Sequence, residues 1–216
     1  MKLLLKITTL LFCVSLYSQN NVLYKGENIN ELDANGNKIG IWKLFDEDNG
    51  VKIITDFSNQ EFPITNFFKN EKLIATFDQN KRLEILKDNK IIKVDYFYKE
   101  NGAQTLIYQN GKELEDELIS YFTQAAFVKA MFYGGINELF SFIGNNFNNN
   151  GQNGSVKVKF VVDRNGSPTN IEVVESSNPK LNEEAIRVIS ISPRWQPTHQ
   201  GGDFVNTPFM IPINIK

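Results

Sequence analysis

The 216-residue chain is poor in the residues that build metal and redox sites, with a single cysteine and a single histidine. One imidazole without a paired nucleophile or a second histidine gives neither a catalytic triad nor a multi-histidine metal site. Residues 198–202 have the composition of a loop, so His199 is interpreted as a solvated loop residue. We therefore expect no catalytic, metal-binding or cofactor-binding residues, and the protein is not predicted to be an enzyme.

A strong charge imbalance is also missing. The formal net charge of −2 gives no support for a nucleic acid or an anionic lipid as partner. No glycine-rich phosphate cradle is visible, because Gly134 and Gly135 follow no strand-like run. Residues 46–48 are acidic but lack the ligand spacing of a calcium loop. No small-molecule substrate is inferred, and the 17 phenylalanines point to a core rich in aromatic side chains.

The chain contains no apolar run long enough to be a clear membrane span. The apolar stretch near the start is interrupted by Lys6 and falls short of the roughly 20 residues that a spanning helix needs. Basic Lys2 and Lys6 before a short apolar segment are typical of a signal peptide, which we place at residues 1–18. An uncleaved anchor and a lipoprotein at Cys13 are the alternatives. Cleavage would remove Cys13 and exclude disulfides from the mature protein.

Residues 20–112 alternate short apolar runs with turn signals. Asn-Gly favours turns with positive φ, which join neighbouring antiparallel strands. The signals are Asn35-Gly36, Asn49-Gly50, Asp88-Asn89, Asn101-Gly102 and Asn110-Gly111. This pattern predicts an antiparallel β-meander of hairpins. Residues 33–42 read D-x-N-G-x-K-x-G-x-W and resemble the MORN and antitoxin-like repeats, although only this first unit is clear. We interpret the aromatic residues as core rather than as an interaction surface.

Residues 113–131 change character. Leu114, Leu118 and Phe122 recur at helical spacing, and acidic residues lie early in the segment, where the helix dipole favours them. We predict a connecting helix over this range.

The last part of the chain has a distinctive order of elements. Residues 156–162 alternate apolar and charged side chains, turn at residues 163–166, and continue into a second alternating run at 170–176. Helical patterns precede this hairpin after Gly135 and follow it from Leu181. Trp195, between Pro193 and Pro197, is expected to be buried against the second helix. The closing segment is again strand-like.

This order resembles the C-terminal domain of TonB, over residues 132–216. The resemblance implies a binding module with an antiparallel sheet and two helices. The whole chain is then an α+β protein: an N-terminal antiparallel β-meander, a connecting helix and a TonB-like domain. The family's long proline-rich spacer is replaced by the meander, so energy transduction does not follow from the resemblance.

In the TonB family the last strand presents an edge to which an extended segment of a partner adds. Here that strand is expected at residues 204–215. The resemblance implies that four residues shape selectivity: Val205, Thr207, Phe209 and Met210. Pro208 and Pro212 are four residues apart, so both lack an N–H on the same edge, which we place outward. That arrangement protects the edge and leaves Met210 as a donor between two gaps.

The leading hypothesis is an exported binding protein of the periplasm or the outer-membrane-associated envelope. Its expected partner is a segment of an outer-membrane receptor or another envelope protein, and a homodimer through the terminal strand is left open. The alternative is a structural or surface protein whose meander binds an envelope component, with the TonB-like domain as a compact support. A hydrolase acting on envelope material is disfavoured.

Overall fold

The computed structural model describes residues 21–78, 82–98, 105–109, 112–113 and 115–216. The predicted signal peptide, residues 1–18, lies outside the described residues. The strands are β1 (Val22–Tyr24), β2 (Glu27–Ile29), β3 (Glu31–Leu32), β4 (Lys38–Ile39), β5 (Ile41–Asp46), β6 (Val51–Asp56), β7 (Ile64–Lys69), β8 (Lys72–Asp78), β9 (Arg82–Lys87), β10 (Lys90–Tyr98), β11 (Thr105–Gln109), β12 (Lys112–Glu113), β13 (Phe127–Val128), β14 (Gly154–Val162), β15 (Pro168–Ser176), β16 (Thr198–Gln200), β17 (Asp203–Val205) and β18 (Thr207–Ile215). The helices are α1 (Asp116–Thr123), α2 (Gly135–Asn146), the short 3-10 helix η1 (Pro179–Leu181) and α3 (Asn182–Ser190). The α+β fold class is confirmed.

From β5 to β12 the predicted meander is an eight-stranded antiparallel sheet whose strands follow one another in sequence order. The first part of the predicted range does not join it, because β1–β2 and β3–β4 form two separate two-stranded sheets. The turn at Asp88-Asn89 uses the predicted chemistry, whereas the turn between β7 and β8 uses Asn70 and Glu71, which were not predicted. The predicted signals Asn101-Gly102 and Asn110-Gly111 lie outside the described residues. At Asp88 and Asn89 the φ angles are 51° and 60°, the left-handed pair that a two-residue hairpin turn needs. Each strand therefore pairs with the next, and β5 remains as one edge of the sheet.

One face of the meander carries the first hydrophobic core. Leu44, Ile53, Phe67, Ala75 and Ile85 lie opposite one another on successive strands, and each is almost fully buried. Helix α1, the segment that follows it and the hairpin β16–β17 pack against this face. The side chains of the strands alternate in exposure, as expected for an antiparallel sheet that is covered on one side only.

Helix α1 is shorter than the 113–131 segment that was expected to be helical. It ends at Thr123, and the chain then forms a turn in which the N–H of Ala125 donates to the carbonyl oxygen of Phe122. Strand β13 follows and pairs with β16, with Val128 opposite His199. A strand partner about seventy residues away in the chain is not visible in a local pattern.

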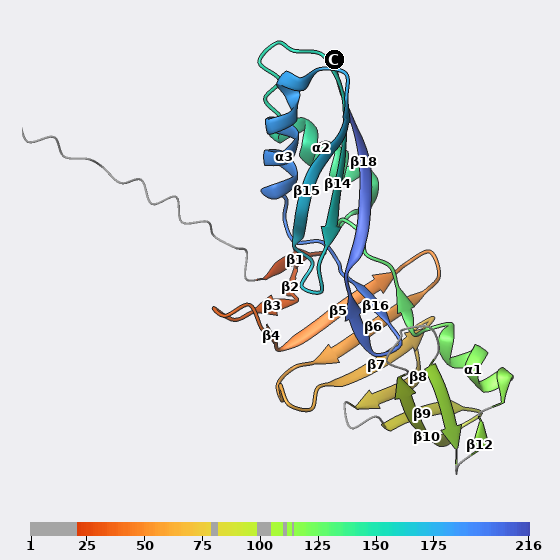
Figure 1. Ribbon diagram of the computed structural model, residues 1–216. Helices are drawn as coiled ribbons and strands as arrows, with labels where there is room; N and C mark the ends of the chain where they lie inside the picture. The colour runs from red at the N-terminus through yellow and green to blue at the C-terminus, as the bar shows by residue number, and fades with distance from the viewer. Residues whose placement is uncertain (1–20, 79–81, 99–104, 110–111, 114) are drawn as a thin grey trace, which may run out of the picture.

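The C-terminal sheet has the order β15-β14-β18, and helices α2 and α3 pack on one face of it (Figure 1). Both helices and the β14–β15 hairpin confirm the predicted order of elements. Trp195 is buried, as predicted, but its ring contacts are with Phe132, Phe160 and Phe209, whose ring centroids lie 5.1–5.3 Å away. These aromatic contacts form the centre of the second core.

The hairpin β16–β17 lies outside the C-terminal sheet and packs into the core of the meander. Phe204 packs against Trp42, with ring centroids 5.5 Å apart, and His199 lies between Phe67 and Phe204. The interpretation of His199 as a solvated loop residue is wrong, because its side chain is fully buried. Neither ring nitrogen makes a hydrogen bond of acceptable geometry. Burial lowers the pKa of His199 to about 3, so the imidazole is neutral.

Two D-x-N-G turns meet at the junction of the halves. Asp33 and Asp163 each hold their own turn, accepting backbone N–H bonds of 2.8 Å. The side-chain amide of Asn165 donates to the carbonyl oxygen of Gly36 at 3.0 Å, and Lys38 donates to the Asn165 side-chain oxygen at 2.5 Å. Gly166 is required here, because a Cβ would lie 2.0 Å from the carbonyl oxygen of Trp195.

Two side-chain amides occupy the edge of β5, where a ninth strand would pair. Asn30 accepts a hydrogen bond from the N–H of Lys43 at 2.6 Å and donates to its carbonyl oxygen at 3.0 Å. Gln196 does the same for Phe45, at 2.7 and 2.8 Å. Both amide residues are almost fully buried. This edge is therefore closed by the chain itself, once from each half.

Candidate functional site: the edge of the terminal strand

Strand β18 forms an edge of the C-terminal sheet. It pairs antiparallel with β14 along its whole length, from Thr207 opposite Val162 to Ile215 opposite Gly154. Among the described residues, no strand pairs with its other side. In Figure 1 β18 stands at the margin of the sheet, away from α3. A strand in this position carries unpaired backbone groups that a partner's strand can use.

The two prolines decide what this edge offers. Backbone groups of a strand point alternately to its two sides, so Pro208 and Pro212 share a side. The ladder with β14 is continuous across both prolines, at Val161 and Lys157. If the two prolines faced β14, the ladder between the strands would lose two backbone N–H donors. We therefore infer that they face outward. The outer edge then presents the N–H groups of residues 210 and 214 only, beside a full row of carbonyl oxygens.

The four residues that were expected to shape selectivity differ from one another in exposure and in contacts. Met210 is the most accessible of them, with 55% of its surface exposed. Phe209 points to the opposite face and stacks on Phe160, with ring centroids 5.6 Å apart. The hydroxyl of Thr207 donates to the Thr198 hydroxyl at 2.6 Å.

Val205 lies outside the terminal strand. It belongs to β17 and pairs with Thr198, whereas β18 begins only at Thr207. The break at the exposed Asn206 occurs because the chain changes its partner strand from β16 to β14. The structure therefore brings Thr207, Phe209 and Met210 onto one strand and leaves Val205 on the hairpin that enters the meander core.

The sheet face next to the edge is lined with ion pairs. Lys159 lies opposite Met210 and binds Glu172 at 3.0 Å, and Lys157 binds Glu175 at 2.7 Å. All four side chains are partly or largely exposed, so each pair contributes at most about 1 kcal/mol. The charged face and the apolar Met210 together form the surface that a partner strand on β18 would meet.

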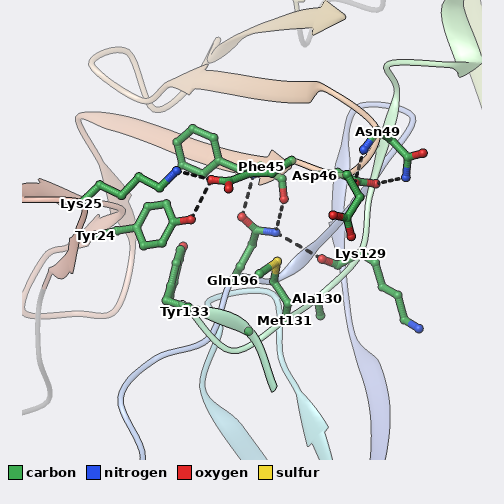
Figure 2. Close-up of a pocket in the computed structure, with 14 residues that line it drawn as sticks. Tyr24, Lys25, Phe45, Asp46, Asn49, Lys129, Ala130, Met131, Tyr133 and Gln196 are labelled. Atoms are coloured by element: carbon green, nitrogen blue, oxygen red, sulfur yellow. Dashed lines mark hydrogen bonds and ion pairs between the residues drawn. The ribbon is translucent and has the colours of Figure 1, made fainter. Parts of the chain in front are cut away.

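Apart from the strand edge, a hollow with a volume of about 700 Å³ lies at the junction of the meander and the C-terminal half. It is bounded by the β1–β2 turn, the end of β5 and its following turn, residues 129–131 and the start of α2. Figure 2 shows Tyr24, Phe45 and Tyr133 on one side, and Gln196, which we call the floor, hydrogen-bonded to the backbone of Phe45 and of Lys129. Sequence patterns gave no signal for this hollow, because its walls come from segments that are distant in the chain.

Neither a metal site nor a membrane-spanning helix emerges from the part of the chain that the structure describes. No group of three or more His, Cys, Asp or Glu side chains there could hold a metal ion. None of the helices described there is long and apolar enough to cross a membrane.

Comparison with known proteins gives one family. Residues 146–216 match the family model described as Gram-negative bacterial TonB protein C-terminal. No curated protein and no solved structure gives a significant match. The matched segment begins at the last residue of α2 and contains the β14–β15 hairpin, α3 and β18. The resemblance of the N-terminal hairpins to MORN or antitoxin-like repeats gains no support and stays a prediction.

Proposed function

We propose that this chain is an exported binding protein of the cell envelope that receives an extended segment of a partner along the outer edge of β18. The partner class is an outer-membrane transport protein or another envelope protein. Proteins of the TonB family engage such receptors through this domain, and residues 146–216 are similar to it. The observation that carries the proposal is that β18 lies at a sheet edge where no described strand pairs with its outer side.

The donor pattern of the edge sets the character of this interaction. An added strand would find the Met210 N–H flanked by two prolines, so it must donate more hydrogen bonds than it accepts. Each backbone hydrogen bond contributes about 0.5–1.5 kcal/mol. With few donors on the edge, binding is expected to be weak and reversible, and Met210 gives the central apolar contact.

A direct test is isothermal titration of the mature full chain with extended peptides copied from periplasm-exposed segments of outer-membrane transporters. Binding that is weakened by Met210→Pro, which removes the central donor, supports strand addition at this edge. Met210→Leu is the matched control, because it keeps the N–H group and an apolar side chain. Equal binding by the parent and by Met210→Pro would contradict the proposal.

The alternative function is a support role, in which the meander binds an envelope component. The tight junction favours it. Arg194 donates to the carbonyl oxygens of Asn30 and, at 3.1 Å, of Asn165, and its guanidinium lies 5.5 Å from the Trp42 ring centre. A C-terminal unit fixed in this way cannot reach far from the meander. Retention of the Met210→Pro variant on purified cell envelopes, at the level of the parent, would favour this alternative.

A further inference from the structure

The hollow at the junction has the size and lining of a ligand site. Its volume of about 700 Å³ lies within the range of roughly 300–1,000 Å³ that is usual for small-ligand sites. No residue of β18 lines it, so it is separate from the strand edge. Ala130, Met131 and the two glycines at the start of α2 leave apolar space in it. The floor is fixed, because Gln196 is hydrogen-bonded to the backbone of Phe45 and of Lys129.

Three aromatic rings form one wall. The ring centre of Tyr24 lies 5.4 Å from that of Phe45 and 5.1 Å from that of Tyr133. The Tyr133 hydroxyl is held by the side-chain amide of Asn30, at 2.6 Å. Burial raises the pKa of Tyr133, so this phenol stays neutral and brings no negative charge of its own.

A carboxylate completes this wall, and it already holds a cation of the same chain. Glu47 accepts hydrogen bonds from the Lys25 ammonium at 2.5 Å and from the Tyr24 hydroxyl at 2.9 Å. Both bonds lower the pKa of Glu47, which is therefore ionised. The Lys25 ammonium also lies 5.5 Å from the centre of the Tyr24 ring. The side chains of Lys25 and Glu47 are 66% and 57% exposed, so their ion pair is open to exchange with solutes.

We propose that this hollow binds a primary ammonium group carried on an apolar stem, such as the lysine side chain of a partner protein or a free alkylamine. The incoming ammonium takes the place of Lys25 on Glu47 and over the Tyr24 ring, where an aromatic face adds to the attraction. Its stem enters the apolar space beside Met131. Besides Lys25, the lining carries three carboxylates, on Asp46, Glu47 and Asp48, and one ammonium group, on Lys129, so its charge disfavours an anionic ligand.

The test is titration of the full chain with pentylamine, followed by NMR shifts of the Tyr24, Phe45 and Met131 signals. Pentanol and hexanoate are the neutral and anionic controls, each with its polar group on the same five-carbon stem. Pentylamine is expected to bind most strongly of the three. A parallel titration uses a peptide that has an acetylated N-terminus and a free lysine side chain. Comparison of its affinity with that of pentylamine shows whether a protein side chain or a free amine is the better ligand.

Two variants separate a ligand site from an ordinary surface ion pair. Lys25→Ala vacates Glu47 and is expected to bind pentylamine about two- to fivefold more tightly, the factor that an exposed ion pair is worth. Glu47→Gln is expected to reduce the affinity to that of pentanol. Lys52→Ala is the matched control, because Lys52 pairs with Glu71 and lies 5.0 Å from the Phe68 ring centre, outside the hollow. No gain in Lys25→Ala, or equal binding of pentanol and pentylamine, would overturn the proposal.

Discussion

The meander and the C-terminal sheet each have an edge strand, β5 and β18, and the backbone groups of the two edges are occupied differently. At β5 the backbone groups of Lys43 and Phe45 are occupied by the amides of Asn30 and Gln196. At β18 no described strand pairs with the outer side, and Pro208 and Pro212 lack the N–H donors of two positions. Closure by side-chain amides depends on the fold of both halves, whereas closure by proline is built into one strand. The comparison implies that β18 is the edge that remains open to a partner.

The largest effect is expected when the support beneath β18 is removed. Trp195→Ala leaves a cavity against Phe132, Phe160 and Phe209, so the free energy of unfolding should fall by about 3–5 kcal/mol. Urea unfolding of the full chain measures the change. A loss below about 1 kcal/mol would mean that Trp195 does not support the edge strand.

Lowering the pH should destabilise the protein through His199, which lies in the hairpin β16–β17. His199 has a pKa of about 3 in the folded protein, against an ordinary value near 6.5 when unfolded. As the pH falls, the unfolded chain therefore binds a proton at His199 before the folded protein does. The contribution of neutral His199 to the free energy of unfolding is complete above pH 6.5 and declines as the pH falls towards 3. Between pH 6.5 and 4.5 the loss should be about 2–3 kcal/mol.

The matched variant for this titration is His199→Leu, which keeps an apolar side chain of similar size in the core. Its unfolding free energy should depend on pH less steeply than that of the parent over the same interval. Parallel pH profiles for the two proteins would show that His199 is not held neutral in the core.

Exposing the edge of β5 should lower the free energy of unfolding by a smaller amount. Gln196→Ala leaves the N–H and carbonyl groups of Phe45 without their amide partner, which should cost about 1–3 kcal/mol. The exposed backbone should also promote self-association, which sedimentation velocity detects. Gln60→Ala, in an exposed loop, is the control. A variant that stays monomeric and as stable as the parent would show that the amide does not close the edge.

The smallest effect concerns the prolines themselves. Replacing Pro208 and Pro212 together with Thr restores two outward donors, so affinity for extended peptides should rise by roughly tenfold or more. Asn214→Thr is the control, because it raises strand propensity on the same side without adding a donor. A double variant that binds no better than the Asn214→Thr control would argue against outward-facing prolines.

The sequence predicts those elements whose pairing is local. The β14–β15 hairpin and the helices starting near Gly135 and Leu181 follow from periodicity and turn residues within short windows. The burial of His199 does not follow from such windows. Its strand is paired with β13, which lies about seventy residues earlier. A polar segment with two glycines has the composition of a loop, and only the long-range packing reverses that interpretation.

The candidate site was predictable to the same extent. The spacing of Pro208 and Pro212 indicates a shared edge, and Met210 between them is the exposed residue that this spacing singles out. The break between β17 and β18 was not predictable, because Val205 and Thr207 belong to one continuous strand-like run in the sequence. The amide contacts of Asn30 and Gln196 depend on tertiary placement alone.

The most direct test of the central claim is the hydrogen exchange rate of single amides, measured by NMR with and without a bound transporter peptide. Strand addition at β18 predicts that the Met210 amide exchanges quickly in the free protein and slowly in the complex. The amides of Lys43 and Phe45, already bonded to Asn30 and Gln196, should be protected in both states. A bound peptide that leaves the exchange of Met210 unchanged would contradict the account.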